Sequence, residues 1–436
     1  MDTDLSIRTL GTCEVNSPLV QNLLQSEESP DFVDDGSAIL LDDRFESVAA
    51  LERLDDAPRL EVAGPRRLIF FDPATTGVGI VTCGGLCPGL NNVIRGLTME
   101  SWHGYGIRRI YGFQYGLEGF IKSYGHEVIE LTPDLVSDVH EQGGSLLSSS
   151  RGPQEPSEIV SRLVELGINV LYVVGGDGSM RAAIAISAEA RRRGLPIAVV
   201  GIPKTIDNDL LYLDKSFGFE TAVAEAVEAI RCAHAEARGA FNGIGLVKLM
   251  GRHSGFLACH ATLATSHVNF CLIPEMPIDE TIGAAFFEKL RARLEKRRHA
   301  VVVVAEGTGQ ERLADASVRD ASGNVKLVDV GVFLADRIKA HFKETDFEFT
   351  LKYIDPSYIV RSVAANPSDS VYCWQLAAAA VHAAMSGRTE LIVGRWHGRM
   401  VHVPIERAIS QRNRVDLEGT LWLSVLETTG QPAKWA

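Results

Sequence analysis

Short runs rich in valine and isoleucine alternate with amphipathic stretches of helical length along most of this chain, from Leu68 onward. The clearest example begins with a predicted helix at Pro156, which Gly167 can end. It continues through the strand NVLYVV, the loop GGDGS, a second helix and the strand PIAVVG. Two strands joined by a crossover helix form a βαβ unit with parallel strands. The pattern therefore predicts an α/β fold in which loops gather at the carboxyl ends of parallel strands, where such sheets bind ligands.

The chain is long enough for more than one hydrophobic core. Its 436 residues exceed the size at which single cores usually stop growing, so we expect two Rossmann-like parallel-sheet domains. Residues 1–64 are acidic and lack a strong period. We interpret them as an N-terminal extension that wraps the core or a partner subunit, with a partly disordered tail as the alternative.

The charge balance and the cysteines limit the class of partner. A formal net charge of −13 disfavours nucleic acid or an anionic membrane surface, because both repel such a chain at long range. The seven cysteines are scattered and show no zinc-site spacing, so we interpret them as reduced thiols. No apolar run reaches the length of a membrane span, and the first residues lack the segments of a signal peptide, so we expect a cytoplasmic protein.

Two glycine loops that follow predicted strands indicate phosphate binding. GGLCPGLNNVIRG at 84–96 precedes a helix, so backbone N–H groups and the helix dipole can attract a phosphate; a glycine turn made for close packing is the alternative. GGDGS at 175–179 adds Asp177, which could hold a Mg²⁺ ion or be only a turn former. NAD kinases and lipid kinases contain the same loop, so it predicts phosphoryl transfer without identifying the acceptor.

The segment PKTIDND at 203–209 supplies acid–base chemistry. A sugar hydroxyl is a poor nucleophile, so a carboxylate should accept its proton, and we assign Asp207 as this general base. Thr205 can orient the substrate, and Asp209 can orient the base or the waters of the metal. A turn rich in aspartate and asparagine, without function, is the alternative.

Further segments carry side chains suited to an anionic substrate. MGRHSG supplies Arg252 and SSSRGPQ supplies Arg151, and a guanidinium group is always charged. Glu306 follows a valine-rich strand and can accept hydrogen bonds from sugar hydroxyls. KYIDPSYIVRS offers donors for a phosphate ester, namely Lys352, Tyr358 and Arg361.

Taken in order, these motifs resemble a known family. GGLCPGLNNVIRG, SSSRGPQ, GGDGS, PKTIDND, KLMGRHSG, VAEG and KYIDPSYIVRS occur in the order found in phosphofructokinases, and most resemble the ATP-dependent branch typified by trypanosomatid and plant enzymes. The resemblance implies the two-domain phosphofructokinase fold and a homo-oligomeric, allosteric enzyme, either a tetramer or a dimer. It also implies glycolytic, Mg²⁺-assisted phosphoryl transfer from ATP to the 1-hydroxyl of fructose 6-phosphate.

The resemblance also assigns the predicted residues to two domains. Residues 65–220 with about 365–412 would form the ATP-binding domain, and residues 221–364 with about 413–436 the fructose 6-phosphate-binding domain. The residues that would contact ATP are Gly84, Gly85, Arg151, Gly152, Gly176, Asp177, Gly178, Ser179 and Lys204, with Asp177 holding Mg²⁺. Those that would contact the sugar phosphate are Thr205, Ile206, Asp207, Met250, Gly251, Arg252, Glu306, Lys352, Tyr358, Ile359, Val360 and Arg361. The catalytic residues would be Asp207, Arg252, Thr205 and Asp209.

Two positions bear on the phosphoryl donor. In pyrophosphate-dependent relatives an aspartate usually follows GGD, where its bulk and charge conflict with the α-phosphate of ATP, whereas Gly178 leaves that space open. Those relatives also carry a lysine at the position of Lys204, so a pyrophosphate-dependent enzyme is the alternative. A non-catalytic regulatory paralogue is an alternative of another class, which the intact Asp177, Asp207 and Arg252 disfavour.

Overall fold

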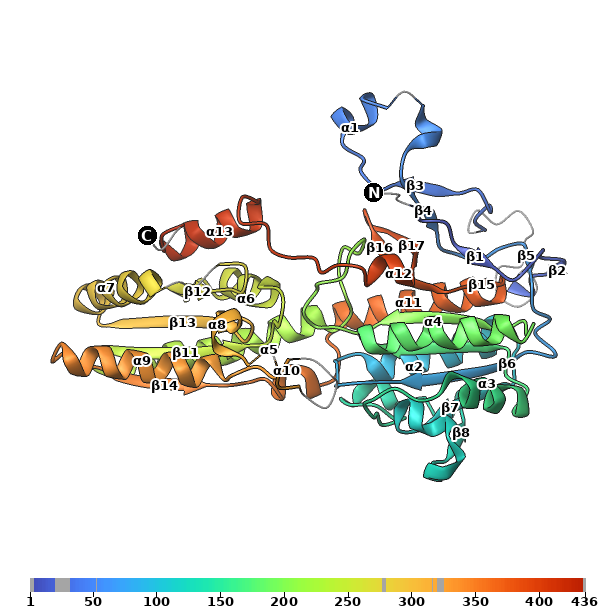
Figure 1. The fold of residues 1–436 in the computed structure, drawn as a ribbon, viewed down its shortest axis with the longest axis horizontal. Coiled ribbons are helices and arrows are strands. Elements are labelled where there is room, and N and C mark those ends of the chain that lie inside the picture. The colour runs from blue at the N-terminus through green and yellow to red at the C-terminus, as the bar shows by residue number, and fades with distance from the viewer. Residues whose placement is uncertain are drawn as a thin grey trace. The chain divides into compact units, whose positions relative to one another are not determined.

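The computed structural model describes residues 4–19, 32–51, 53–276, 280–315, 317–319 and 325–433. It divides into two compact units, which Figure 1 shows coloured along the chain. Unit 1 comprises Met1–Thr205, Leu210–Phe217 and Ala364–Gln411. Unit 2 comprises Ile206–Asp209, Gly218–Val363 and Arg412–Ala436. Among the described residues, no helix has the length and apolarity needed to cross a membrane.

Unit 1 is built on a nine-stranded sheet with the order β3-β4-β17-β16-β10-β9-β6-β7-β8. The five strands from β16 to β7 are parallel, and the strands at both edges are antiparallel. The strands are β3 (Ala38–Leu40), β4 (Arg59–Val62), β6 (Gly77–Thr82), β7 (Arg109–Phe113), β8 (Val128–Glu130), β9 (Val170–Gly175), β10 (Ala198–Pro203), β16 (Leu391–Trp396) and β17 (Arg399–Pro404). The predicted βαβ unit is confirmed as β9, α4 (Asp177–Arg192) and β10.

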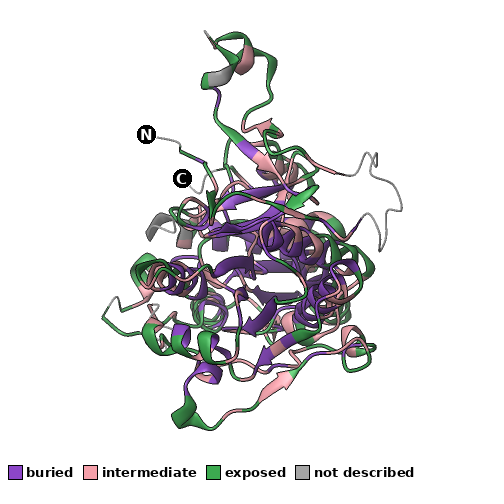
Figure 2. Ribbon diagram, turned by 90° about the vertical axis from the view of Figure 1, so that its right-hand side faces the viewer, coloured by how far each residue is buried: buried purple, intermediate pink, exposed green. Residues whose placement is uncertain are grey.

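Two pairs of helices cover this sheet. On one face, α3 (Pro156–Glu165) and α4 pack against each other and share a buried cluster with Leu171 and Val173 of β9. Strand residues alternate between faces, so Tyr172 and Val174 face α2 (Leu90–Met99) and α11 (Pro367–Met385). A Cβ on Gly96 of α2 would lie 2.6 Å from that of Ala377, so the glycine permits the close approach of these two helices. Figure 2 shows the resulting interior of buried strands.

The described N-terminal residues pair with unit 1 through several short strands. β1 (Arg8–Thr9) pairs with β15 (Arg388–Thr389), and β2 (Val15–Asn16) pairs with β5 (Leu68–Ile69). β3 and β4 extend the main sheet, with α1 (Phe45–Ala49) between them. Buried charges reinforce this pairing, because the Glu61 carboxylate of β4 forms an ion pair with Arg388 and a 2.6 Å hydrogen bond with His402 of β17. Strands of two to four residues show no readable period, and sequence analysis did not identify them.

Unit 2 contains a four-stranded parallel sheet with the order β12-β13-β11-β14. A Cβ on Gly243 or Gly245 of β11 would collide with α5, so the even-numbered residues of β11, including Lys248, face the other side, where α9 lies. The strands are β11 (Gly243–Leu249), β12 (Phe270–Leu272), β13 (His299–Ala305) and β14 (Thr350–Ile354). The helices are α5 (Phe219–Gly239), α6 (Phe256–Thr265), α7 (Glu280–Arg297), α8 (Gln310–Leu313), α9 (Val330–Glu344), α10 (Ile359–Ser362) and α13 (Thr420–Thr429).

One further helix, α12 (Ile405–Ala408), belongs to unit 1, where it follows β17.

Candidate active site

Three of the predicted segments follow neighbouring parallel strands of unit 1. The register pairs Thr82 of β6 with Val174 of β9, and Pro203 of β10 with Gly175 of β9. The three strands therefore end at the same edge of the sheet. The loops GGLCPG, GGDGS and the start of PKTIDND begin at this edge, as expected for a ligand site of an open α/β sheet.

The first glycine loop is tied to the segment that carries Arg151. Gly84 has a φ of +84°, a backbone conformation that favours glycine. Its N–H donates to the carbonyl of Ser150 at 3.1 Å, and its carbonyl accepts from the Ser149 hydroxyl at 2.7 Å. Arg151 and Gly152 follow directly and are exposed, while Gly84 and Gly85 are half-buried. These contacts bring two of the predicted ATP-binding segments together.

The second glycine loop opens helix α4, whose positive dipole end attracts anions. Gly176 is the residue before the helix, and Asp177, half-buried, is its first residue. A Cβ on Gly175 would lie 2.3 Å from Oγ of Ser179, so the buried serine requires a glycine there. By contrast, Gly178 is exposed, and a Cβ on it would meet nothing within 4 Å. The space at Gly178 is open.

Lys204 brings an ammonium group to these loops. Its side chain is buried, its N–H donates to the carbonyl of Gly175 at 3.0 Å, and its Nζ lies 3.8 Å from the point a Cβ on Gly84 would occupy. Burial raises the pKa of the adjacent Cys83 thiol to about 12, although Ser179 and Lys204 act to lower it. The thiol therefore stays protonated, and the Lys204 ammonium is the charge that this residue brings to the glycine loops.

In unit 2, Asp207 is attached to the loop that follows β11. Its Oδ2 accepts the backbone N–H of Arg252 at 3.4 Å, and its carbonyl accepts the Ser254 hydroxyl at 3.0 Å. Gly251 has a φ of +127°, and a Cβ on it would lie 2.5 Å from the Ser254 carbonyl, so the turn requires glycine. Arg252 itself donates from Nη1 to the carbonyl of Val325 at 2.8 Å. The general-base candidate and the arginine candidate are thus held side by side.

Glu306 completes this group at the end of β13, the strand next to β11. Its N–H donates to the carbonyl of Leu249 at 2.8 Å. Burial, and then the nearby charge of Asp207, raise the pKa of Glu306 to about 7, against the opposing influence of Arg252, Lys248 and Arg361. These interactions place Glu306 in one electrostatic environment with Asp207, Arg252 and Arg361.

Asp209 occupies a different setting from Asp207. It is buried, its Oδ2 forms an ion pair with Nη1 of Arg412 at 3.1 Å, and its carbonyl accepts the N–H of Asn413 at 2.8 Å. These contacts hold the 206–209 segment to the C-terminal part of unit 2. They favour a positioning role over direct contact with a substrate.

The remaining predicted contacts differ in exposure. The Arg361 guanidinium lies 4.9 Å from the ring centre of Tyr358, which is 75% exposed, and Ile359 is 60% exposed. Lys352 is exposed in the middle of β14, where it pairs with Gly245 and so faces the α5 side. The other members are half-buried (Thr205, Met250) or buried (Ile206, Val360).

Sequence analysis missed two residues of this site, Ser254 and Lys248. Ser254 stands two positions after Arg252 in MGRHSG and binds the backbone of Asp207. Lys248 is a charged residue inside an otherwise apolar strand, and that contrast was the available signal.

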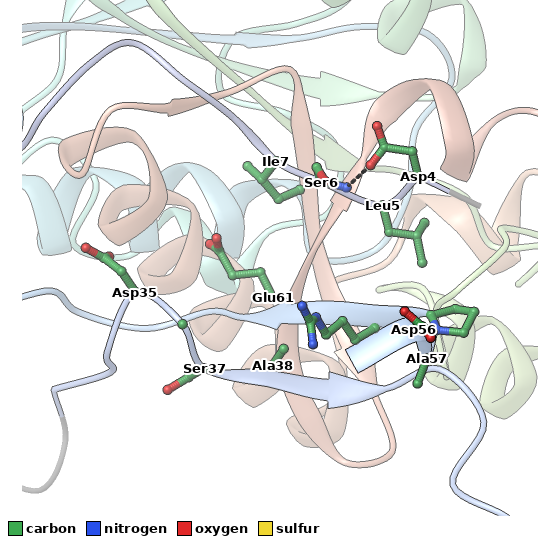
Figure 3. Close-up of a pocket in the computed structure, with 13 residues that line it drawn as sticks. Asp4, Leu5, Ser6, Ile7, Asp35, Ser37, Ala38, Asp56, Ala57 and Glu61 are labelled. Carbon is green, nitrogen blue, oxygen red and sulfur yellow. Dashed lines mark hydrogen bonds between the residues drawn. The ribbon is translucent and has the colours of Figure 1, made fainter. Parts of the chain in front are cut away.

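A cavity of about 840 Å³ lies elsewhere in unit 1 and contains none of the predicted site residues (Figure 3). It is lined by residues 4–7, 35–38 and 56–59 and by Glu61 of β4. Two of its carboxylates already have partners, since Asp35 pairs with Arg66 and Arg388, and Glu61 pairs with Arg388. We therefore do not place the active site there.

Comparison with known proteins identifies similar chains. The family model described as phosphofructokinase matches residues 77–384, more than half of the chain. A protein of Amycolatopsis methanolica named ATP-dependent 6-phosphofructokinase is 49% identical over 442 residues, which cover 99% of this chain and 96% of that protein. A protein of the same name from Trypanosoma cruzi is 48% identical over 372 residues, covering 85% of this chain and 76% of that protein.

Among solved structures, the pyrophosphate-dependent phosphofructokinase of Marinobacter aquaeolei has a TM-score of 0.66 to this chain. The two are 21% identical, and the match covers 81% of this chain and 91% of the other. At this identity the likeness shows the fold alone.

Proposed function

Because this chain belongs to the phosphofructokinase family, we propose that it is an ATP-dependent 6-phosphofructokinase. It transfers a phosphoryl group from ATP to the 1-hydroxyl of fructose 6-phosphate, giving fructose 1,6-bisphosphate and ADP in glycolysis. The observation that carries the proposal is the hydrogen bond from the backbone N–H of Arg252 to Asp207, beside Glu306, because it joins a proton acceptor to the chain segment that carries a permanent positive charge. A non-catalytic paralogue would have no need of this arrangement.

ATP is the proposed donor on two grounds. The open space at Gly178 can admit the α-phosphate of a nucleotide, which a side chain there would oppose. In addition, the relatives at 49% and 48% identity carry ATP in their names. The pyrophosphate-dependent alternative rests on Lys204, whose ammonium can serve either phosphate chain.

The residues of unit 2 would act on the acceptor. Asp207 accepts the proton of the 1-hydroxyl as the oxygen attacks, and the Arg252 guanidinium stabilises the negative charge of the transferring group. Glu306 has a pKa of about 7, so near neutral pH it can accept hydrogen bonds from sugar hydroxyls when ionised and donate one to them when protonated. Arg361 offers a planar fork of donors to the 6-phosphate.

Asp177 would hold Mg²⁺. The described residues contain no cluster of three or more metal-ligating side chains, but Mg²⁺ at phosphoryl-transfer sites commonly takes one or two carboxylates, with phosphates and waters as its other ligands. A single half-buried carboxylate at the start of α4 fits this requirement. Bound there, Mg²⁺ supplies charge neutralisation on the phosphates.

We further propose a homodimer or homotetramer in the cytoplasm. The exposure of Tyr358 and Ile359, adjacent residues in a segment assigned to the substrate, supports an assembly in which a second copy covers them. Light scattering of the purified chain would test this. Allosteric regulation stays a prediction from the sequence.

The decisive experiment measures fructose 1,6-bisphosphate formation from fructose 6-phosphate and Mg²⁺, with ATP and pyrophosphate supplied in parallel. We expect product with ATP only. Product with pyrophosphate only would show that Lys204 outweighs Gly178 in donor choice. No product with either donor, from a protein that still binds nucleotide, would contradict the assigned acceptor.

A further inference from the structure

Lys248 connects three elements of unit 2 that the active-site residues depend on. It lies in β11, and the residue is only 9% exposed. Its Nζ lies 3.0 Å from Oδ2 of Asp329 and 2.8 Å from Oδ2 of Asp355. One buried ammonium therefore joins the end of β11 to the start of α9 and to the end of β14.

The Asp329 end of this link is fixed by other bonds. Asp329 caps α9, and its Oδ1 accepts the N–H groups of Gly331 at 3.0 Å and Val332 at 3.1 Å. The same oxygen accepts the hydroxyl of Tyr353 in β14 at 3.0 Å. The bonds to Oδ1 thus orient the Asp329 carboxylate, so that its other oxygen, Oδ2, faces Lys248 whether or not the lysine is present.

The Asp355 end begins the loop that carries the phosphate-binding candidates. Asp355 follows β14 directly, and its Oδ1 accepts the N–H of Ser357 at 3.1 Å as well as the Ser357 hydroxyl. Tyr358 comes next, and Arg361 follows in α10. At the other end of the link, Lys248 is four residues before Arg252 in the same chain segment.

We propose that Lys248 is a positioning residue for the acceptor, which sets the loop 355–361 against the end of β11 so that Arg361 and Arg252 act on one sugar phosphate. This inference rests on the proposed function and names a residue outside the predicted site. With one ammonium between two carboxylates, the cluster keeps a net negative charge. Without the ammonium, the two carboxylates repel each other and the loop moves away from β11.

A purely structural role is the competing explanation, because breaking a buried ion pair also destabilises a fold. The two explanations differ in kinetics. Loss of positioning raises KM for fructose 6-phosphate while KM for ATP stays unchanged, because the predicted nucleotide loops lie in unit 1. General destabilisation lowers the active fraction and leaves both KM values unchanged.

The test is steady-state kinetics of the full chain with Lys248→Met, Lys248→Arg and Asp355→Asn. Lys339→Met is the matched control, since Lys339 forms an exposed ion pair with Asp336 on α9. We expect Lys248→Met to raise KM for fructose 6-phosphate at least tenfold, with KM for ATP within twofold of wild type. Lys248→Arg should recover part of the loss. Equal changes in both KM values, or no change in either, would overturn the proposal.

A double variant supplies an independent check. If Lys248 and Asp355 act as one link, the Lys248→Met/Asp355→Asn variant should show no larger KM change than the more affected single variant. If the KM change of the double variant equals the product of the two single-variant fold changes, the two residues act separately. If Lys248→Met does not fold, Asp355→Asn removes the same link from its other end and must show the same selective KM change.

Amide hydrogen exchange separates this proposal from the proposed function. Without any substrate, Lys248→Met should speed exchange in residues 355–361 and leave β13 unchanged. Wild-type turnover of fructose 6-phosphate tests the function, whereas the exchange of this loop tests the link. Unchanged exchange at 355–361 would overturn the role of Lys248 whatever the activity.

Discussion

The backbone N–H of Arg252 donates a 3.4 Å hydrogen bond to Oδ2 of Asp207. This contact joins the proposed proton acceptor to the segment that carries the proposed charge stabiliser. Both residues belong to unit 2, whereas the glycine loops belong to unit 1. A change at Asp207 should therefore affect chemistry without affecting the nucleotide loops.

Asp207→Asn should lower kcat by about a thousandfold, because an amide cannot accept the proton of the 1-hydroxyl. Nucleotide affinity, measured by calorimetry, should stay within twofold of wild type. Asp336→Asn is the control, since this exposed carboxylate of the same unit lies in a surface ion pair of little energetic value. Near-normal turnover of Asp207→Asn would remove the general-base assignment.

Gly178→Asp should raise KM for ATP at least tenfold, because the new carboxylate lies beside the phosphates. The fold should tolerate it, since a Cβ at this position meets nothing within 4 Å. Gly178→Asn fills the same space without charge and serves as the control that separates charge from bulk. If the aspartate variant kept the wild-type KM for ATP, the space at Gly178 would have no part in donor choice.

Glu306 makes stability depend on pH in a defined direction. Its pKa is about 7 in the folded protein against the usual 4.5 of a glutamate, so the folded state binds the proton more tightly. The stabilisation from this group is complete below pH 4.5 and is lost as the pH rises to 7, by up to about 3 kcal/mol. Urea unfolding of wild type and Glu306→Gln across this range should show the difference.

Burial is the larger cause of that raised pKa, and a second variant tests the smaller contribution of the nearby Asp207 charge. Asp207 helps to raise the pKa of Glu306, so in an Asp207→Asn background the pH-dependent loss should occur at lower pH. A stability difference between wild type and Glu306→Gln that does not vary with pH would contradict the assignment.

The parts of the site that were predictable are contiguous in sequence. The glycine loops and the start of PKTIDND stand directly after apolar parallel strands, whose carboxyl ends lie at one edge of the sheet. By contrast, Lys248 binds Asp329, which is 81 residues away in the sequence, and Arg388 binds Glu61, which is 327 residues away. Such pairs depend on sheet register and on strands too short to show a period, and local patterns carry no information on either.

Arg388→Leu should reduce the stability of unit 1 by about 3 kcal/mol, because it removes the buried guanidinium that pairs with both Glu61 and Asp35 and leaves these carboxylates with Arg66 and His402 as buried partners. Arg8→Leu breaks the exposed ion pair with Glu390 and should cost less than about 1 kcal/mol. Urea denaturation measures both. Equal effects would show that the buried network contributes no more than a surface pair.

The same network predicts acid sensitivity. Although burial opposes it, hydrogen bonds from His402 and Arg388 lower the pKa of Glu61 to about 2, so its stabilisation is present above pH 4.5 and is lost as the pH falls toward 2. Glu61→Gln should show a smaller loss of stability over this range than wild type.

The interleaving of the two units has a consequence for the newborn chain. β10 pairs with β16, which is synthesised only after most of unit 2. At the usual pace of ribosomes, β10 therefore waits on the order of ten seconds with one apolar edge unpaired. Truncated products that stop within unit 2 keep this open edge permanently. The cell should recognise them as clients for chaperones or proteases, and activity should appear only once the chain is nearly complete.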